Sequence, residues 1–274
     1  MPEGDTIFRA ANSLRTWICG RVVTGFSTRK SMLLSAGVVG STISEIRTHG
    51  KHLFIDFTPD VGGVPLVLRT HMMMSGSWHV YTLGQPWQRP ASQAVVEIRV
   101  GERIAVCFNA PVVELSAKSA GAKGEFIRDL GPDILQQPLD VDAIEKRQES
   151  QAATEPVSVT ILNQHVVSGV GNLYRSESLF LVGINPFSTR LQVSSNRFRK
   201  LVECAAELMH ANLPPASSAR TFGEGFATPW VYGRAQRPCR RCKTTIQTQR
   251  VGNPPRSVYW CPTCQPGEQL KPRL

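Results

Sequence analysis

The chain has 274 residues, of which 41% are hydrophobic, and its formal net charge is +10 at pH 7. This composition excludes a globally disordered protein and is sufficient for one large domain or two smaller ones. The sequence has no run of about 18 apolar residues and no basic start followed by an apolar stretch, so neither a membrane span nor a secretory signal is expected. We therefore expect a cytoplasmic protein, and the positive charge favours a polyanionic partner such as nucleic acid.

The chain begins Met1-Pro2-Glu3-Gly4, and removal of Met1, which we expect, leaves proline as the first residue. A terminal proline offers a secondary amine, which attacks an aldehyde to give an electron-withdrawing iminium ion. Because a free α-amino group titrates near pH ~8, part of it is an uncharged nucleophile at neutral pH. Pro2 is therefore a candidate nucleophile and Glu3 a candidate proton carrier, although most prolines at this position have no chemical role.

Residues 3–18 carry apolar side chains at helical spacing, which predicts a helix with Asp5 or Thr6 as its N-cap and Gly20 as its stop. Such a helix would hold the start of the chain in place, as a catalytic terminus requires. From Arg21 to about Phe126, short β-rich runs alternate with Gly, Pro and Ser. That spacing is typical of an antiparallel β-sandwich.

The pattern becomes helical after Leu130-Gly131-Pro132, with helices predicted over 141–147, 157–164, 172–182 and 196–212 and a loop over 216–229. Gly169 and Gly171 precede the third of these helices, and Asn172 can cap it. Glycine permits positive φ and close backbone approach, and a helix N-terminus attracts anions. This turn is a candidate phosphate-binding site or, alternatively, only a tight connection between two helices.

Two Cys-x-x-Cys pairs stand near the end of the chain, Cys239 with Cys242 and Cys261 with Cys264. Four thiolates from two tight turns can surround one Zn²⁺ ion tetrahedrally, whereas two disulfides do not suit a reducing cytosol. Because all four ligands are cysteine, no coordination position stays open, and we expect one structural zinc that stabilises a short β-hairpin. The segment from Arg234 to Leu274 has nine Lys or Arg and one acid, which favours a polyanion-binding surface.

Several motifs in this order resemble the bacterial formamidopyrimidine-DNA glycosylase and endonuclease VIII family over nearly the whole chain. They are Pro2-Glu3-Gly4, Thr48-His49-Gly50-Lys51, Leu130-Gly131-Pro132-Asp133, Gly169-Val170-Gly171-Asn172, Val231-Tyr232-Gly233-Arg234 and the stretch from Arg256 to Gln265. The resemblance implies an α+β multidomain fold. Its parts are an N-terminal helix with an antiparallel β-sandwich (1–131), a helix–two-turn–helix DNA-binding domain (132–232) and a four-cysteine zinc-finger hairpin (233–274).

The same resemblance implies a bifunctional DNA glycosylase and AP lyase of base excision repair, which excises oxidised bases and cuts the abasic strand. Pro2 would attack C1′ of the damaged nucleotide to form a Schiff base, and Glu3 would move protons at the opening sugar. Lys51 matches the family lysine that contacts phosphate and donates a proton in β-elimination. Arg256 matches the finger arginine that clamps phosphates and is linked to δ-elimination. The implied partner is DNA with oxidised bases or abasic sites, bound by a monomer.

The DNA-binding residues that the resemblance implies are His71, Met74, Arg128, Asn172, Tyr232 and Arg256. His71 matches a phosphate contact, and Arg128 lies one position from a family phosphate-binding arginine. Met74 matches the wedge that fills the space left by the flipped nucleotide, although three consecutive methionines also suit adaptable core filling. Tyr232 belongs to the motif before the finger.

The chain departs from the family pattern in its recognition segments. Thr6 stands where many members have a glutamate that lines the base pocket, and residues 109–114 lack the Arg and Phe of the formamidopyrimidine branch. The loop from Ser217 to Pro229 is also short for holding an oxidised purine. We therefore expect the endonuclease VIII branch and oxidised pyrimidines. A DNA-binding or damage-sensing member without efficient base excision is the alternative, and a zinc-ribbon protein that assembles with other proteins is a third.

Overall fold

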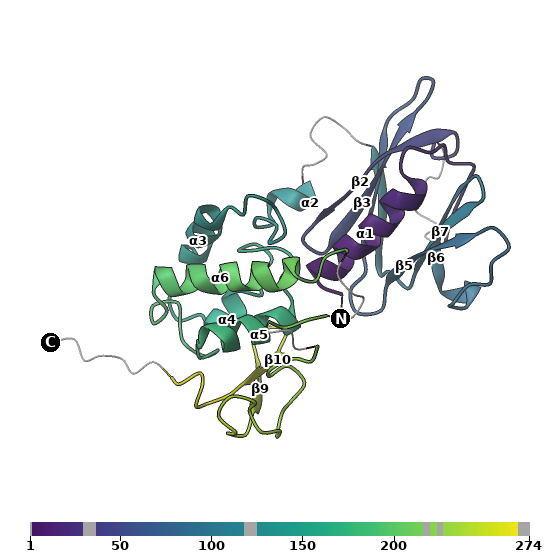
Figure 1. Ribbon diagram of the computed structural model, residues 1–274. Helices are drawn as coiled ribbons and strands as arrows, with labels where there is room; N and C mark the ends of the chain where they lie inside the picture. The colour runs from purple at the N-terminus through teal and green to yellow at the C-terminus, as the bar shows by residue number, and fades with distance from the viewer. Residues whose placement is uncertain (1, 30–36, 118–124, 216–219, 224–226, 268–274) are drawn as a thin grey trace. The chain divides into compact units, whose positions relative to one another are not determined.

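The computed structural model describes residues 2–29, 37–117, 125–215, 220–223 and 227–267 (Figure 1). The chain divides into two compact units, Met1–Asp129 and Leu130–Leu274, and each is described by itself. Part of the loop predicted at 216–229 lies outside the described residues. Within the described ranges, no helix has the length and apolar character needed to span a bilayer. Our separation of the second unit at residues 232 and 233 stays a prediction.

The first unit begins with helix α1 (Gly4–Ile18), as the apolar spacing predicts. Its inner face buries residues one turn apart, namely Ile7, Ala11, Leu14 and Ile18. The backbone carbonyl of Glu3 accepts the N–H groups of Thr6 (2.9 Å) and Ile7 (3.1 Å), so Glu3 is the N-cap. The prediction that Asp5 or Thr6 caps the helix is therefore wrong, because both lie inside its first turn.

Two four-stranded antiparallel sheets form the predicted β-sandwich. One has the strand order β2-β3-β4-β8, formed by β2 (Ser41–His49), β3 (His52–Pro59), β4 (Leu66–His71) and β8 (Val112–Ala117). The other has the order β1-β6-β7-β5, formed by β1 (Gly25–Thr28), β6 (Ala94–Val100), β7 (Arg103–Phe108) and β5 (Ser77–Thr82), with a 3-10 turn (Ala91–Gln93) before β6. In β3, Leu53, Ile55 and Phe57 are buried in the core. A short helix, α2 (Glu125–Arg128), ends the unit.

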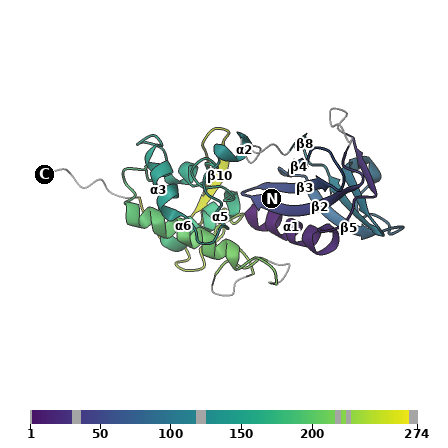
Figure 2. The ribbon, with the colours of Figure 1, turned by 90° about the horizontal axis from the view of Figure 1, so that it is seen from above.

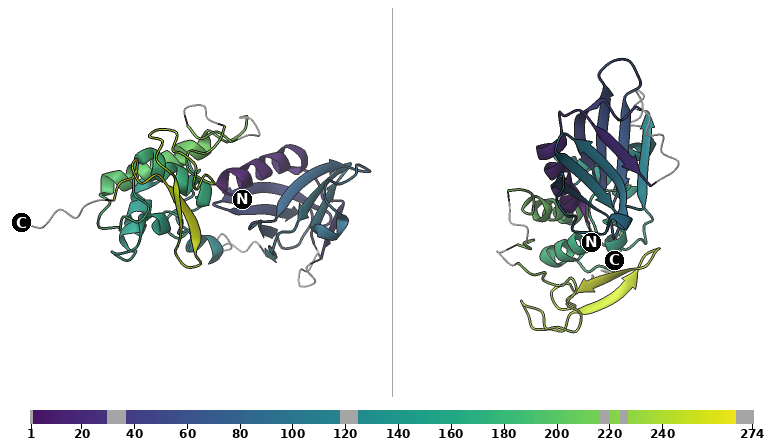
Figure 3. Two further views of the ribbon diagram at one scale, coloured as in Figure 1. Left: turned by 90° about the horizontal axis from the view of Figure 1, so that it is seen from below. Right: turned by 90° about the vertical axis from the view of Figure 1, so that its right-hand side faces the viewer.

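The second unit contains helices and a hairpin that share one core. Its elements are α3 (Val141–Glu149), α4 (Val157–Thr160), α5 (Asn172–Val182), α6 (Ser195–His210), β9 (Gln247–Val251) and β10 (Arg256–Trp260). Figure 3 shows the β9–β10 hairpin in yellow beside the green helices, and β10 contacts α5. Tyr174 and Phe180 of α5 belong to the same buried cluster as Ile246 and Cys261 of the C-terminal part. The predicted zinc-finger hairpin is thus present, and it packs on the helices rather than standing apart.

Candidate nucleic-acid interface and metal centre

Helix α1 places the start of the chain at one end of the sandwich. Its backbone runs antiparallel to β2, because Gly20 donates its N–H to the Ile43 carbonyl (2.8 Å) and Arg15 donates its Nε–H to the Ile46 carbonyl (2.6 Å). Figure 2 shows α1 lying along β2 and β3. Going back along α1 therefore leads toward the His49 end of β2. Pro2, half-buried, and Glu3, fully buried, lie at that end.

The same end of the sandwich carries the predicted lysine. Residues 50 and 51 form the turn between β2 and β3, whose last cross-strand pair is His49 with His52. His52 pairs in turn with His71, the last residue of β4. The pairing register thus brings Lys51 and His71 to the end that also holds the start of α1.

The turn after β4 presents the predicted wedge residue. The Gly76 N–H donates to the Met72 carbonyl (2.7 Å), and a Cβ on Gly76 would lie 2.7 Å from the Met72 backbone, so this tight turn requires glycine. Met72 is buried, whereas Met73 and Met74 are 50% and 64% exposed. Core filling therefore explains Met72 alone, and Met74 is available for insertion.

An ion pair that sequence reasoning missed joins β4 to β8 on the face of the sheet that points away from the core. Arg69 of β4 donates two hydrogen bonds to the Glu114 carboxylate of β8, at 3.0 and 2.8 Å. Such paired contacts fix a guanidinium in orientation as well as in position. Arg69 is 8% exposed and also contacts the His52 ring. The register that pairs residues 69 and 114 is a tertiary feature without a local sequence signal.

In the second unit, one buried arginine joins the start of α5 to the finger. Asn172 is the first residue of α5 and Gly171 is its N-cap, so our prediction that Asn172 caps the helix is wrong. Gly169 has φ of 104°, as the glycine-rich turn suggested. Arg175, fully buried, hydrogen-bonds the Asn172 side chain and donates to the Ser257 carbonyl (2.8 Å). Ser257 follows the exposed Arg256 in β10, so Asn172 and Arg256 belong to one connected arrangement.

A buried carboxylate holds the segment that carries Tyr232. Glu177 of α5 accepts the backbone N–H groups of Trp230 (2.6 Å), Val231 (3.0 Å) and Tyr232 (2.9 Å). The Tyr232 ring meets the Tyr259 ring edge-on, with centroids 5.3 Å apart. Sequence reasoning missed both Glu177 and Arg175. Residues 173–180 are buried throughout, but four of the eight are polar or charged, so no apolar run in the sequence marked the two charges as buried groups that need partners.

The predicted residues therefore fall into two groups, one in each unit. Pro2, Glu3, Lys51, His71 and Met74 come together at one end of the first unit. Asn172, Tyr232 and Arg256 all lie in the second unit, Asn172 at the start of α5, Tyr232 on a segment bound by Glu177 of α5, and Arg256 on β10, which contacts α5. Arg128 ends α2 and is exposed. Its predicted DNA contact stays a prediction.

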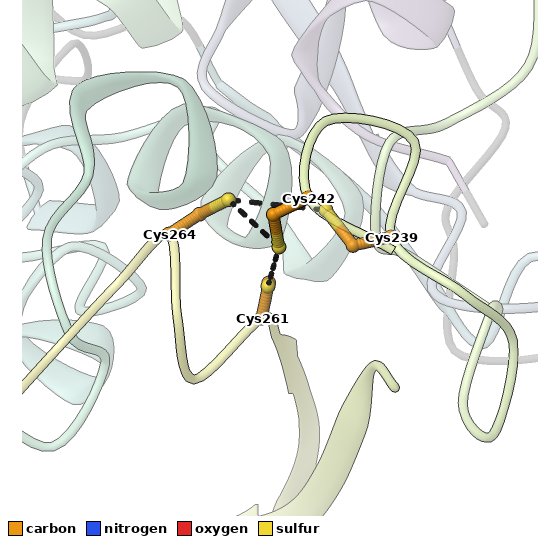
Figure 4. Close-up of side chains that lie close together, drawn as sticks. All are labelled: Cys239, Cys242, Cys261 and Cys264. Carbon is orange, nitrogen blue, oxygen red and sulfur yellow. Dashed lines mark hydrogen bonds between the residues drawn. The ribbon is translucent and has the colours of Figure 1, made fainter. Parts of the chain in front are cut away.

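The four cysteines form a cluster that suits a tetrahedral metal ion (Figure 4). Their Sγ atoms all lie within 4.8 Å of one another. Three of the Sγ–Sγ distances are 3.9 Å (Cys239 to Cys264), 3.3 Å (Cys242 to Cys261) and 3.5 Å (Cys242 to Cys264). Zn–S bonds of about 2.3 Å place tetrahedral sulfurs about 3.8 Å apart. The donor set and its spacing thus fit Zn²⁺, which would be held by the four thiolates.

Comparison with known proteins agrees with this arrangement. The model of the formamidopyrimidine-DNA glycosylase N-terminal domain matches residues 1–111, and that of the formamidopyrimidine-DNA glycosylase H2TH domain matches residues 130–222. A probable endonuclease 8 2 of Streptomyces coelicolor is 35% identical, covering 99% of this chain and 96% of the relative. The chain belongs to the formamidopyrimidine-DNA glycosylase and endonuclease VIII family. The resemblance inferred from the motifs is therefore confirmed.

Other family members match over similar lengths. The DNA-(apurinic or apyrimidinic site) lyase Nei2 of Mycolicibacterium smegmatis is 30% identical, covering 97% of this chain and 99% of the relative. The structure of Lactococcus lactis formamidopyrimidine DNA glycosylase bound non-covalently to AP-site DNA has a TM-score of 0.79. It is 21% identical and covers 97% of this chain and 100% of that chain. The fold prediction, with its N-terminal sandwich, helical domain and C-terminal cysteine cluster, is thereby confirmed.

Proposed function

We propose that this chain is a bifunctional DNA glycosylase and AP lyase of base excision repair, acting as a monomer on DNA with oxidised bases or abasic sites. One observation carries the proposal. Helix α1 fixes Pro2 and Glu3 at the end of the sandwich that also presents Lys51 and His71. A terminal amine, a carboxylate and a cation are the groups that imine chemistry at a phosphate-bearing sugar requires.

In the excision step, the Pro2 nitrogen donates its lone pair to C1′ of a flipped nucleotide. The bond from C1′ to the base breaks, and the base leaves with the electron pair. Glu3 then takes the proton from the Pro2 nitrogen and passes it to the ring oxygen O4′ as the C1′–O4′ bond breaks, which opens the sugar and leaves an iminium ion between Pro2 and C1′. The burial of Glu3 beside the terminus supports this role, because the helix N-cap holds its backbone in one position.

In the lyase step, the iminium ion acidifies the hydrogen on C2′. Loss of that proton expels the 3′ phosphate by β-elimination, and a second elimination expels the 5′ phosphate. Lys51 would contact the phosphate next to the sugar and donate a proton during β-elimination, as its family counterpart does. Arg256 would bind the flanking phosphates through its planar, permanently charged guanidinium.

The second unit would hold the DNA backbone. Arg175 links the Asn172 side chain to the backbone carbonyl of Ser257, the residue after Arg256, and this supports contact of both Asn172 and Arg256 with one phosphate stretch. Zn²⁺, when bound, would stabilise the hairpin that carries Arg256 and would take no part in the chemistry. Tyr232, held by Glu177, would add a further DNA contact.

Oxidised pyrimidines are the substrate class that the insertion loops favour. The connection between β7 and β8 contains only residues 109–111, and Val113, just beyond it, is buried. This turn has no room for the Arg and Phe pair of the formamidopyrimidine branch. Relatives that are named as endonuclease 8 support the endonuclease VIII branch.

The test is borohydride capture on abasic DNA, with the adduct located by mass spectrometry. We expect the peptide that begins at Pro2 to carry the reduced sugar, and Pro2→Ala, which has a primary amine instead, to be captured less. Lys51→Gln should still be captured but cut the strand more slowly, whereas Lys146→Gln, at an exposed site on α3, should behave as wild type. An adduct on any other residue would refute the mechanism.

A damage-binding protein without efficient excision is a second candidate. The observation in its favour is Thr6, which lies in the first turn of α1 where many relatives have a pocket glutamate. This candidate predicts tight, strongly salt-dependent binding to abasic duplexes without cleavage of any lesion in a panel. Turnover on one defined oxidised base would eliminate it.

A further inference from the structure

Two connections cross between the sheets of the first unit side by side. One is the Met-rich turn, residues 72–76, which joins β4 to β5, and the other joins β7 to β8. Their ends are paired directly, because His71 pairs with Val112 across β4 and β8, and Ser77 pairs with Phe108 across β5 and β7. The Met-rich turn therefore lies next to the shorter connection.

A hydrogen bond joins the two connections. Ser75 of the Met-rich turn donates its hydroxyl to the backbone carbonyl of Asn109 at 3.2 Å, across 34 positions of the chain. The Met73 N–H, by contrast, donates to His71 Nδ1 at 3.2 Å, which is a contact between near neighbours in the sequence. The bond from Ser75 thus ties the turn to a separate segment of the chain.

The Met-rich turn has a backbone that needs such support. Met73 has φ of 48°, in the left-handed region that residues with a Cβ seldom adopt. A conformation of this kind persists only where surrounding contacts hold it. The side chains of Met73 and Met74 are exposed and do not anchor the turn in the core. Buried Met72 anchors one side of the turn, and the bond from Ser75 anchors the other.

Asn109 is itself held in place through its backbone and its side chain. Its N–H donates to the Gln93 carbonyl at 2.9 Å, and its Nδ2 donates to Gln93 Oε1 at 2.9 Å. Asn109 has φ of 49°, and asparagine is one of the few residues besides glycine that tolerate this region. Ala110, the next residue, is buried in the core. The carbonyl that accepts from Ser75 therefore has a fixed position.

We propose that Asn109, oriented by Gln93, is a positioning residue that holds the Met-rich turn through Ser75. The turn then presents Met73 and Met74 in one conformation before DNA binds. Less conformational entropy is therefore lost when the turn enters the space that a flipped nucleotide leaves. The inference rests on the proposed function, because it assumes that Met74 enters the DNA.

The test measures insertion of the turn, using a duplex with 2-aminopurine opposite a tetrahydrofuran abasic analogue. The fluorescence of 2-aminopurine rises when the base is displaced from the stack. The product of the association constant and the rise at saturating protein is proportional to the equilibrium constant for insertion, whatever fraction of the complexes is inserted. Division by the association constant for an undamaged duplex removes changes in general DNA binding, and we name the result the insertion constant.

Ser75→Ala removes the donor from an exposed side chain, and Ser75→Thr retains the hydroxyl. Loss of one neutral hydrogen bond should lower the insertion constant about two- to tenfold in Ser75→Ala. Ser75→Thr should restore it. Ser77→Ala is the matched control, because the Ser77 hydroxyl contacts His79 within β5 (3.0 Å) and should leave the insertion constant unchanged.

Asn109→Gly keeps the left-handed backbone and loses the amide, so it should also lower the insertion constant. In the double variant with Ser75→Ala the two losses should not add, because Asn109 acts through Ser75. An insertion constant in Ser75→Ala equal to that of wild type would overturn the proposal. Additive losses in the double variant, or an equal loss in Ser77→Ala, would overturn it as well.

These outcomes are distinguishable from failure of the proposed function. A Pro2 adduct together with equal insertion constants in wild type and Ser75→Ala would reject only the role of Asn109. Absence of capture and cleavage, with the loss in Ser75→Ala intact, would reject the enzyme and leave the positioning of the turn in place.

Discussion

Replacement of the buried Glu177 by alanine should loosen the segment that joins the helices to the finger. The carboxylate accepts three backbone N–H groups, from residues 230, 231 and 232, at 2.6, 3.0 and 2.9 Å. A hydrogen bond to a charged group contributes about 1.5–3 kcal/mol, and a buried donor left without an acceptor costs about 1–3 kcal/mol. Because the three bonds share one acceptor and are not additive, we expect a loss of about 3–5 kcal/mol rather than their sum.

One further variant separates the charge of Glu177 from its shape, and a variant at another position is the control. In Glu177→Gln, the amide oxygen can still accept from Val231 and Tyr232, while the amide nitrogen faces the N–H of Trp230. The expected loss is about 1.5–3 kcal/mol, the value of one charged hydrogen bond. Glu203→Gln, at an exposed position of α6, is the control and should change stability by less than about 0.5 kcal/mol.

Native-state hydrogen exchange at the amides of residues 230–232 measures this opening locally, without interference from the first unit. The free energy of opening should fall in the order Glu203→Gln, Glu177→Gln, Glu177→Ala. If Glu177→Ala opens within 1 kcal/mol of wild type, the reasoning about these three bonds is refuted. Equal effects of Glu177→Gln and Glu177→Ala would show that the remaining amide oxygen contributes nothing.

Three other outcomes are expected. Chelation of the metal should lower the unfolding temperature of the second unit, because the core of that unit includes Cys239 and Cys261. The unfolding temperature of the first unit should not change. Calorimetry that shows equal shifts for the two units would contradict this prediction. Arg241→Gln should destabilise the second unit by about 0.5–2 kcal/mol in urea unfolding, because its guanidinium lies 4.6 Å from the centre of the Phe180 ring. Gly76→Ala should destabilise the Met-rich turn by about 1–3 kcal/mol and weaken abasic-DNA binding in anisotropy titrations, and an unchanged Kd would count against it.

The elements predicted correctly are those with a strong local pattern. Helix 3–18, the hairpin between the cysteine pairs and the helix over 172–182 all follow from short-range periodicity or spacing. The β-rich region was predicted without bounds for its single strands, and β2 shows why: a bulge between Ile43 and Glu45 shifts the alternation of buried and exposed residues by one position. The helix predicted over 157–164 ends at Thr160 instead. There Asn163 accepts the backbone N–H of His165, a local turn that competes with the helix.

The residues of the candidate site also fall into those with a local sequence signal and those without one. Motifs located Pro2, Lys51 and Asn172, because each stands in a short stretch with a distinctive composition. The residues that hold them were not predictable, because their partners are far apart in the chain. Arg69 and Glu114 are 45 positions apart. Such contacts depend on strand register, which no local pattern specifies.

The continuous core of the second unit limits how the chain can be divided in the laboratory. A fragment that stopped at residue 222, where the family helical module ends, would lack Trp230, Ile246 and Cys261, all of which are buried against the helices. It would expose apolar surface and leave Glu177 without the backbone groups it binds. Chimeras between relatives should therefore exchange residues 130–267 as a single piece.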